Sequence, residues 1–219
     1  MVFPPKCFGC AQQGSWACDE CWGKLALIKT PICYRCQRLS PGFAVCQRCR
    51  RSSPLRRLVV AGYWQNPLRA WVLALKYRRA RVLSRYLTAL LIDALQLADV
   101  AAVDVVVPVP LHYVRRFRRG FNQAQELAQL VAGHLRKPLV ASLLRVRNTK
   151  PQFSLSRWDR LSNVAGAFDV NPAAEAIIKN RTILVVDDVI TTGATIEECA
   201  RSLKQKGAKA VWGLVLAKA

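Results

Sequence analysis

The sequence contains no apolar run long enough to cross a membrane. Its most hydrophobic stretch, LTALLIDALQLADVAAVDVVVPVP, is interrupted by Asp93, Asp99 and Asp104, whereas a membrane-spanning helix needs about 20 mostly apolar residues. The first ten residues, MVFPPKCFGC, also lack the apolar core and small-residue cleavage site of a secretory signal. We therefore expect no membrane insertion and a cytosolic protein.

Acidic residues are scarce. There are 13 Asp plus Glu against 34 Lys plus Arg, which gives a net charge of +21. The basic residues gather in segments 48–57, 77–85 and 115–120. Clusters of this kind favour a polyanionic partner such as nucleic acid, although a solvated basic surface is the alternative. The aromatic residues beside them are Tyr77, Tyr113, Phe117 and Phe121. If their rings are exposed, they favour single-stranded DNA, because bases stack on free rings.

Two common nucleotide-binding motifs are also missing. The chain has neither the G-x-x-x-x-G-K-[ST] spacing of a P-loop nor the G-x-G-x-x-G of a dinucleotide fold.

With 219 residues, 52% of them hydrophobic, the chain is long enough for one main domain with a full core and a small appendage. We place the boundary between residues 1–54 and 55–219.

Cysteine is abundant only at the start of the chain, where four C-x-x-C pairs occur. In a reducing compartment such pairs predict metal ligands, and two pairs complete the tetrahedral four-sulfur site of a structural zinc. An iron–sulfur cluster or a redox dithiol is the alternative. We assign the pairs to two zinc sites in sequence order, with a cross-braced pairing still open. The predicted ligands are Cys7, Cys10, Cys18, Cys21, Cys33, Cys36, Cys46 and Cys49.

Beyond the cysteines, strand and helix patterns alternate. This order predicts a mostly parallel, doubly wound α/β sheet. We expect strands at 58–64, 103–110, 139–144, 183–187 and 210–217, and helices at 66–79, 81–98, 122–137 and 193–206. Asn66 is expected to cap the first of these helices. A basic loop is expected at 113–120, and a long mobile loop or short hairpin at 145–168.

The stretch ILVVDDVITTGAT, residues 183–195, predicts a strand, a loop and a helix start. Asp187 and Asp188 would lie at the carboxyl end of a buried strand, where α/β folds bind ligands. The loop that follows offers backbone N–H groups, hydroxyls and a glycine, which suit one phosphate group. Carboxylates would repel phosphate, so their expected task is to accept hydrogen bonds from sugar hydroxyls, directly or through Mg2+. A ribose 5-phosphate moiety meets both requirements.

This stretch resembles the phosphoribosyl pyrophosphate (PRPP) motif of type I phosphoribosyltransferases. The segments ALKY, VPVPLH, RGFNQA and TKPQFSLSRWDRLSNVAGAF, together with the four C-x-x-C pairs, resemble the ComF family of competence proteins, including its GntX-like members. The resemblance covers nearly the whole chain. It implies the type I phosphoribosyltransferase fold behind a zinc-binding region, and a role in DNA uptake during natural transformation or in the use of DNA as a nutrient. DNA-processing proteins are then potential partners.

The resemblance also implies roles for particular residues. Asp187 and Asp188 would hold the ribose hydroxyls, and Arg115 and Arg119 would face the diphosphate. The loop for the 5-phosphate would consist of Val189, Ile190, Thr191, Thr192, Gly193, Ala194 and Thr195. The catalytic loop of similar enzymes would here carry Lys150, Gln152, Arg157 and Arg160.

Two further residues, Asn122 and Lys76, have two interpretations each. Asn122 either caps a helix or binds substrate, and Lys76 either reaches phosphate or lies at the surface. His112 follows a proline-rich loop, which makes it a weak candidate for acid–base catalysis. An active enzyme would be a Mg2+-dependent phosphoribosyltransferase with an unidentified acceptor, whereas some proteins of this fold bind PRPP only as regulators.

Overall fold

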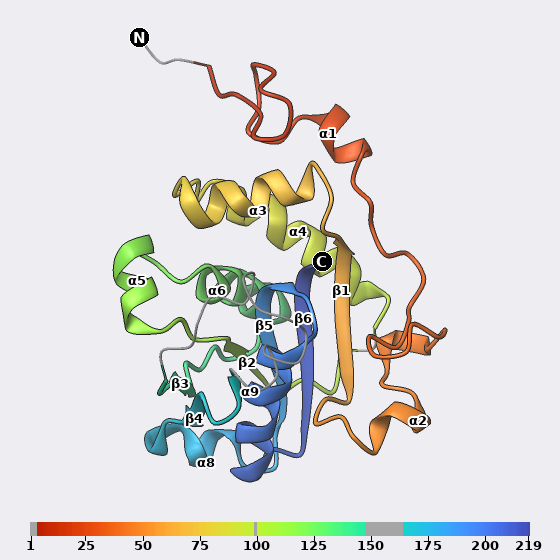
Figure 1. Ribbon diagram of the computed structural model, residues 1–219, viewed down its shortest axis with the longest axis vertical. Helices are drawn as coiled ribbons and strands as arrows, with labels where there is room; N and C mark the ends of the chain where they lie inside the picture. The colour runs from red at the N-terminus through yellow and green to blue at the C-terminus, as the bar shows by residue number, and fades with distance from the viewer. Residues whose placement is uncertain (1–3, 99, 148–163) are drawn as a thin grey trace.

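The computed structural model describes residues 4–98, 100–147 and 164–219, and of Arg115, Arg116 and Arg118 it describes only the backbone. Its centre is a sheet of four parallel strands in the order β1-β6-β5-β2 (Figure 1). Their bounds are Arg57–Tyr63 for β1, Val105–Pro108 for β2, Thr182–Ile190 for β5 and Ala210–Lys218 for β6. The strands read as nearly continuous apolar runs because both faces of the sheet are buried. The predicted parallel α/β sheet is confirmed.

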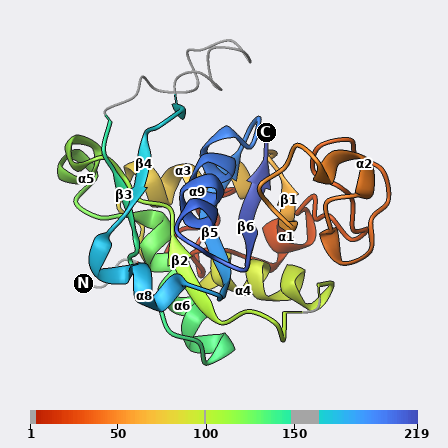
Figure 2. The same ribbon diagram turned by 90° about the horizontal axis from the view of Figure 1, so that it is seen from below.

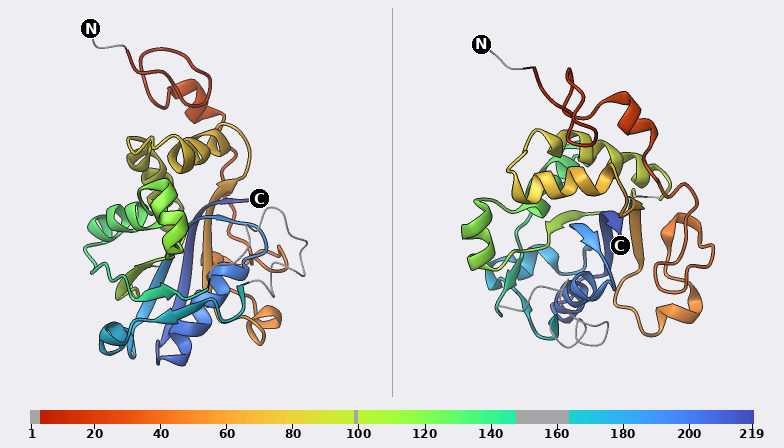
Figure 3. Two further views of the ribbon diagram at one scale, coloured as in Figure 1. Left: turned by 60° about the vertical axis from the view of Figure 1, so that its left-hand side comes forward. Right: turned by 45° about the horizontal axis from the view of Figure 1, so that its top comes forward.

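Helices cover both faces of this sheet (Figure 3). On one face lie α4, which contacts β1 and β6, and α6, which contacts β2 and β5, while α9 covers β5 and β6 on the other face. The helix α3 packs on α4. The bounds are Leu68–Tyr77 for α3, Leu83–Gln96 for α4, Gln123–Leu135 for α6 and Ala194–Gln205 for α9. None of the helices in the described ranges is long and apolar enough to span a membrane.

A second, antiparallel sheet is formed by β3 (Leu143–Arg145) and β4 (Phe168–Val170), which lie side by side in Figure 2. These strands flank the segment 145–168 expected as a loop or hairpin, of which residues 148–163 lie outside the described residues. A short 3-10 helix, η3 (Pro172–Ala174), and α8 (Glu175–Ile178) follow. The expected basic loop is instead mostly helical, since α5 spans Tyr113–Arg119.

The N-terminal region contacts the larger domain at three places. Its short elements are α1 (Asp19–Gly23), the 3-10 helix η1 (Pro41–Phe43) and α2 (Gln47–Arg50). The first pair of C-x-x-C motifs lies beyond α3, and the second lies beside β1 (Figure 1). Between them, residues 26–28 run along the edge of the sheet: Ile28 N–H donates to the carbonyl of Ala61, and Tyr63 N–H to that of Ala26, both at 2.9 Å. This contact covers the open edge of β1.

Three predicted boundaries are wrong. Helix α3 begins at Leu68 with Pro67 in the cap position and no side-chain cap, so Asn66 does not cap it. Strand β5 runs past Asp187 to Ile190, because β6 continues to pair with it as far as Lys218. The segment 139–144 is extended only at its ends: Leu139 bridges to Val106, and β3 begins at Leu143.

Candidate functional site

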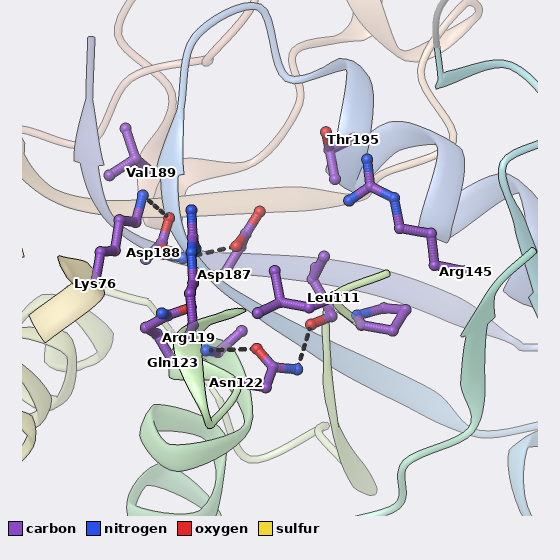
Figure 4. A pocket seen from close by; sticks show the side chains of 13 residues that line it. Lys76, Leu111, Arg119, Asn122, Gln123, Arg145, Asp187, Asp188, Val189 and Thr195 are labelled. Carbon is purple, nitrogen blue, oxygen red and sulfur yellow. Dashed lines mark hydrogen bonds and ion pairs between the residues drawn. The ribbon is translucent and has the colours of Figure 1, made fainter. Parts of the chain in front are cut away.

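A pocket opens where β5 and β2 end. Asp187, Asp188 and Val189 of β5 line it together with Thr195 of α9. The remaining lining residues are Lys76, Val109, Pro110, Leu111, Arg119, Asn122, Gln123, Ala124 and Arg145. Figure 4 shows that Arg145 and Thr195 lie on one side of the acidic pair and Lys76 on the other, while Arg119 overlaps the pair in this view. The pocket therefore surrounds two carboxylates with cationic and hydrogen-bonding groups.

Asp188 is held by a buried ion pair. Lys76 in the last turn of α3 places Nζ 2.7 Å from Asp188 Oδ1, and the two side chains are only 16% and 12% exposed. Of the two earlier interpretations of Lys76, the surface position is excluded by this burial. Removing either partner of a buried pair leaves the other charge uncompensated, so the pair fixes α3 against the end of β5.

Asp187 is in a different electrostatic state. Its Oδ1 accepts the backbone N–H of Asp188 at 2.8 Å. Burial, and then the charge of Asp188, raise the pKa of Asp187 to about 7, against the opposing effects of that N–H, Lys76 and Arg145. A carboxylate so perturbed in a cleft is typical of a functional site. A hydroxyl donor or a cation would stabilise its charged form.

The segment between β5 and α9 turns at Gly193. This residue has φ +86°, and a Cβ added to it would lie 3.4 Å from the Tyr34 ring. Thr192 Oγ1 accepts the N–H of Ala194 at 3.3 Å, and Gly193 O accepts the N–H of Glu197 at 2.9 Å. The loop thus leads directly into the N-terminal turn of α9, where backbone N–H groups and the helix dipole favour an anion.

A first prediction concerns Gly193. We expect Gly193→Ala to lower the free energy of unfolding by about 1–2 kcal/mol, because a side chain is disfavoured at its φ of +86°. Urea denaturation measures the change. Gly133→Ala is the matched control: it lies in α6 with open space around its Cα, and there alanine should stabilise the protein by about 0.5–1 kcal/mol. Equal effects of the two substitutions would contradict the special role of the turn.

The wall opposite the loop comes from the start of α6. Asn122 caps this helix by accepting the N–H of Ala124 at 3.1 Å, and it also donates to the carbonyl of Val109 at 3.0 Å. Of the two interpretations of Asn122, the structure therefore supports the helix cap, which connects α6 to the loop after β2.

The side chain of Gln123, next to Asn122, is 1% exposed. Its Oε1 accepts from Arg119 Nη1 at 3.2 Å, so its amide orientation is determined.

Gln123 Nε2 is a buried donor that no hydrogen-bond acceptor meets within the described part of the chain. Buried donors without partners are costly, and at the wall of a pocket such a donor fits a ligand oxygen. The motif RGFNQA contained this residue, but its pattern alone favoured Asn122. A helix-start motif cannot indicate which of two adjacent amides is satisfied by the backbone.

The cysteines form two separate clusters. One contains Cys7, Cys10, Cys18 and Cys21, the other Cys33, Cys36, Cys46 and Cys49, and in each the sulfur atoms lie within 4.8 Å of one another. The pairing is therefore in sequence order rather than cross-braced. The Sγ atoms of Cys10 and Cys18 are 3.5 Å apart and those of Cys36 and Cys46 3.6 Å. Sulfurs about 2.3 Å from a tetrahedral zinc are separated by about 3.8 Å, so both clusters fit this metal.

The surrounding backbone favours the thiolate form of one cysteine in each cluster, whereas burial and the neighbouring sulfurs raise the pKa of Cys21 and Cys49. Burial raises the pKa of Cys7, but backbone N–H groups of Cys18, Cys10 and Gly9 outweigh it and lower the value to about 6. In the second cluster burial likewise raises the pKa of Cys33, and the N–H groups of Cys46, Cys36 and Arg35 lower it to about 7. Thiolates are the form that binds zinc, and four sulfur ligands close the coordination sphere, which makes the sites structural.

Two family models match the chain. Residues 80–218 match the phosphoribosyl transferase domain, and residues 1–50 match the double zinc ribbon domain. Competence protein F of Haemophilus influenzae is 30% identical over 93% of this chain and 98% of its own length. The chain belongs to the ComF family. Further ComF relatives are DNA utilization protein YhgH of Escherichia coli, 35% identical over 71% of this chain and 69% of its own, and competence protein ComFC of Bacillus subtilis, 38% identical over 47% and 39%.

In this ComF chain the pocket brings together only part of the predicted site. Asp187, Asp188, Val189, Thr195 and Arg119 line it. Lys150, Gln152, Arg157 and Arg160 lie outside the described residues, and the side chain of Arg115 is also not described. The sequence analysis missed Gln123 and Arg145. Arg145 ends β3, and its only signal was a basic residue beside the segment expected to carry the catalytic cations.

His112 is buried. Its Nδ1 accepts the backbone N–H of Val114 at 3.4 Å, and its ring lies 4.3 Å from that of Tyr113. It therefore stabilises the start of α5. Cys199 is also fully buried, in α9.

Proposed function

We propose that this ComF-family protein acts in the use of DNA taken up by the cell, and that it binds PRPP or a related ribose phosphate and contacts single-stranded DNA. Of the three relatives described above, two are named for competence and one for DNA utilization. We place it in the cytoplasm, with residues 1–54 as the zinc-binding domain and 55–219 as the phosphoribosyltransferase-like domain. DNA-processing proteins are its expected partners.

The observation that carries the ligand proposal is the arrangement of opposite chemistries in one pocket. Asp187 and Asp188 lie on one strand end, and Arg119 and the spare donor of Gln123 lie on the opposite wall. Carboxylates accept hydrogen bonds from ribose hydroxyls, whereas the arginine fork and the amide donate to phosphate oxygens. PRPP carries hydroxyls and phosphate groups on one ribose ring. The N-terminus of α9, which follows the turn at Gly193, would bind its 5-phosphate.

The residues present also fit Mg2+, which prefers carboxylate and phosphate oxygens. When bound, this ion would neutralise charge on the diphosphate. Asp187 and Asp188 would hold it or the ribose hydroxyls, while Lys76 keeps Asp188 in place. Arg119 would orient the diphosphate, and its own guanidinium is held by Gln123 and by Tyr77, whose hydroxyl accepts from it at 3.4 Å.

The DNA proposal depends on exposed rings. Phe117 is 89% exposed, Tyr113 75% and Tyr77 63%. Tyr113 and Phe117 are four residues apart on α5 and so share one side of the helix. Exposed rings beside arginines form the kind of platform on which unpaired bases stack. Phe121 differs, since it is partly buried and lies under Arg81, 5.6 Å from its ring centre.

Calorimetric titration separates the two halves of this proposal. The protein is titrated with PRPP plus Mg2+ and then, in a separate cell, with a short single-stranded oligonucleotide. Binding of both supports the proposal. Failure of PRPP to bind at millimolar concentration would exclude the ribose phosphate site, and failure of the oligonucleotide to bind at low salt would exclude the DNA surface.

A second function is supported by the same hydrogen-bond donors. An active Mg2+-dependent phosphoribosyltransferase would need donors that stabilise the departing diphosphate, and Arg119 and Gln123 are placed for this. The acceptor would be a base or an amine. Release of pyrophosphate on addition of candidate acceptors tests this activity, and PRPP binding without any release would favour a regulatory ligand.

A second prediction follows from the pKa of Asp187. Binding through its charged form must displace a proton below pH 7, since burial raises its pKa to about 7. We therefore expect affinity for Mg2+ and PRPP to fall by up to about tenfold per pH unit between pH 7 and 5.5. Calorimetry across this range measures the change. The Asp187→Asn variant should bind PRPP more weakly, and its affinity should depend much less on pH. If its affinity changed with pH as in the wild type, Asp187 would not be the group that titrates on binding.

A further inference from the structure

One buried carboxylate connects the second cysteine cluster to α9, whose first turn lines the pocket through Thr195. Glu197 in the first turn of α9 is 3% exposed. Its Oε1 accepts from the Tyr34 hydroxyl at 2.5 Å and from Arg35 Nε at 2.9 Å, and its Oε2 accepts from Arg35 Nη2 at 2.9 Å. Tyr34 and Arg35 are the two residues between Cys33 and Cys36. The turn between Cys33 and Cys36 is therefore hydrogen-bonded to α9, the helix that follows the proposed phosphate loop.

The same turn contacts the loop itself. The Tyr34 ring packs against Gly193, where a Cβ would approach it to 3.4 Å. Glu197 N–H donates to the carbonyl of Gly193, so the carboxylate held by the arginine and the turning residue of the loop belong to one helical turn. On the other side of this turn, Thr195 lines the pocket. The loop is thus held between the ligand site and the cysteine turn.

This contact is more than the packing of two surfaces. Arg35 meets the carboxylate in a two-pronged arrangement, which fixes orientation as well as distance. The Tyr34 hydroxyl is also bonded to Ser53 Oγ at 2.8 Å, and Arg35 Nη1 donates to Ser52 Oγ at 2.7 Å. Both side chains are therefore also held by hydrogen bonds that do not involve Glu197. Their backbone is set by Cys33 and Cys36, whose positions zinc would fix.

We propose that Tyr34 and Arg35 are positioning residues for the ligand site, which hold the phosphate loop in its binding shape through Glu197. This inference rests on the proposed PRPP site. It follows that the metal state of the second cysteine cluster and phosphate binding are coupled, because a ribbon turn that loses its shape releases the first turn of α9. By the same linkage, ligand binding at the loop stabilises the ribbon.

The test compares zinc-loaded full-length variants Arg35→Ala and Tyr34→Phe with the wild type. Hydrogen exchange of the amides of residues 191–197 is measured without ligand, and affinity for PRPP with Mg2+ is measured by calorimetry. We expect exchange in Arg35→Ala to accelerate at least about fivefold and affinity to fall about 5- to 150-fold, the usual range of coupling between sites. Tyr34→Phe keeps the ring against Gly193 and should show a smaller change in the same direction.

Arg38→Ala is the matched control, since it removes an exposed arginine from the same ribbon and should alter neither measurement. Zinc content is determined for each variant. If Arg35→Ala loses zinc, Tyr34→Phe decides, because it leaves the charge and the ring in place. Wild-type exchange rates in both variants would overturn the inference. If the wild type itself fails to bind PRPP, the proposed function fails, and the exchange rates still decide whether the ribbon orders the loop.

Discussion

Replacing Asp187 by Asn is expected to weaken PRPP binding by at least about tenfold. Asparagine keeps the size of the side chain but loses the charge that hydroxyl donors or Mg2+ require. Hydrogen bonds to a charged group contribute about 1.5–3 kcal/mol each, and 1.4 kcal/mol is a factor of ten in affinity. Calorimetry with PRPP and Mg2+ measures the loss, and zinc content should stay unchanged.

The stability of the same variant separates a ligand role from a structural one. Because the folded-state pKa of Asp187 is raised to about 7 from 3.8, the folded protein binds more protons than the unfolded chain between these values. The contribution of this group to stability is then greatest at low pH and is lost as pH rises through 7. Asp187→Asn removes that loss, so at pH 8 we expect stability equal to or above wild type. A destabilised variant with normal PRPP affinity would show instead that the acid only supports the fold.

Asp188 is expected to behave differently. Its carboxylate neutralises Lys76 at 2.7 Å, so Asp188→Asn leaves a buried ammonium without its partner, at a cost of about 3–5 kcal/mol. Adding Lys76→Met should recover part of this stability but not the PRPP affinity. A double change of both acids to Asn therefore mixes two effects, and only the single variants distinguish them.

The sequence predicted the framework of the site because the framework depends on local patterns. The apolar run before Asp187 predicts a buried strand, and the spacing from Ile196 to Leu203 predicts the helix after it. The C-x-x-C spacing predicts both clusters, since each pair presents its thiolates from one turn. These features need no knowledge of the distant chain.

The contacts that decide the chemistry could not be predicted in this way. Lys76 pairs with Asp188, and Arg35 with Glu197, across more than a hundred residues of sequence. Such pairs form only where the sheet order brings segments together. Strand β5 continued beyond its expected end for the same reason, because β6 supplied backbone partners. The raised pKa of Asp187 likewise comes from tertiary burial rather than from its neighbours alone.

Replacing both Tyr113 and Phe117 by Ala is expected to weaken single-stranded DNA binding by more than about tenfold. Their rings are 75% and 89% exposed on one side of α5, and base stacking on an aromatic side chain contributes about 1–3 kcal/mol per base. Fluorescence anisotropy with a labelled oligonucleotide at low salt measures the change. Because the two rings are exposed, the free energy of unfolding should change little.

The salt dependence of DNA affinity distinguishes the loss of stacking rings from the loss of charged contacts. The net charge of +21 favours binding through several phosphates. We therefore expect affinity to fall steeply with salt, by about 0.7 in the logarithm per phosphate contact for each tenfold rise in salt concentration. The Tyr113 and Phe117 variant should lower affinity at every salt concentration without changing this slope, since it removes no charge. Leu39→Ala removes a similarly exposed side chain, 75% accessible, from the ribbon region and serves as control. If the double variant binds like the wild type, or if Leu39→Ala weakens binding as much, then α5 is not the surface on which the bases stack.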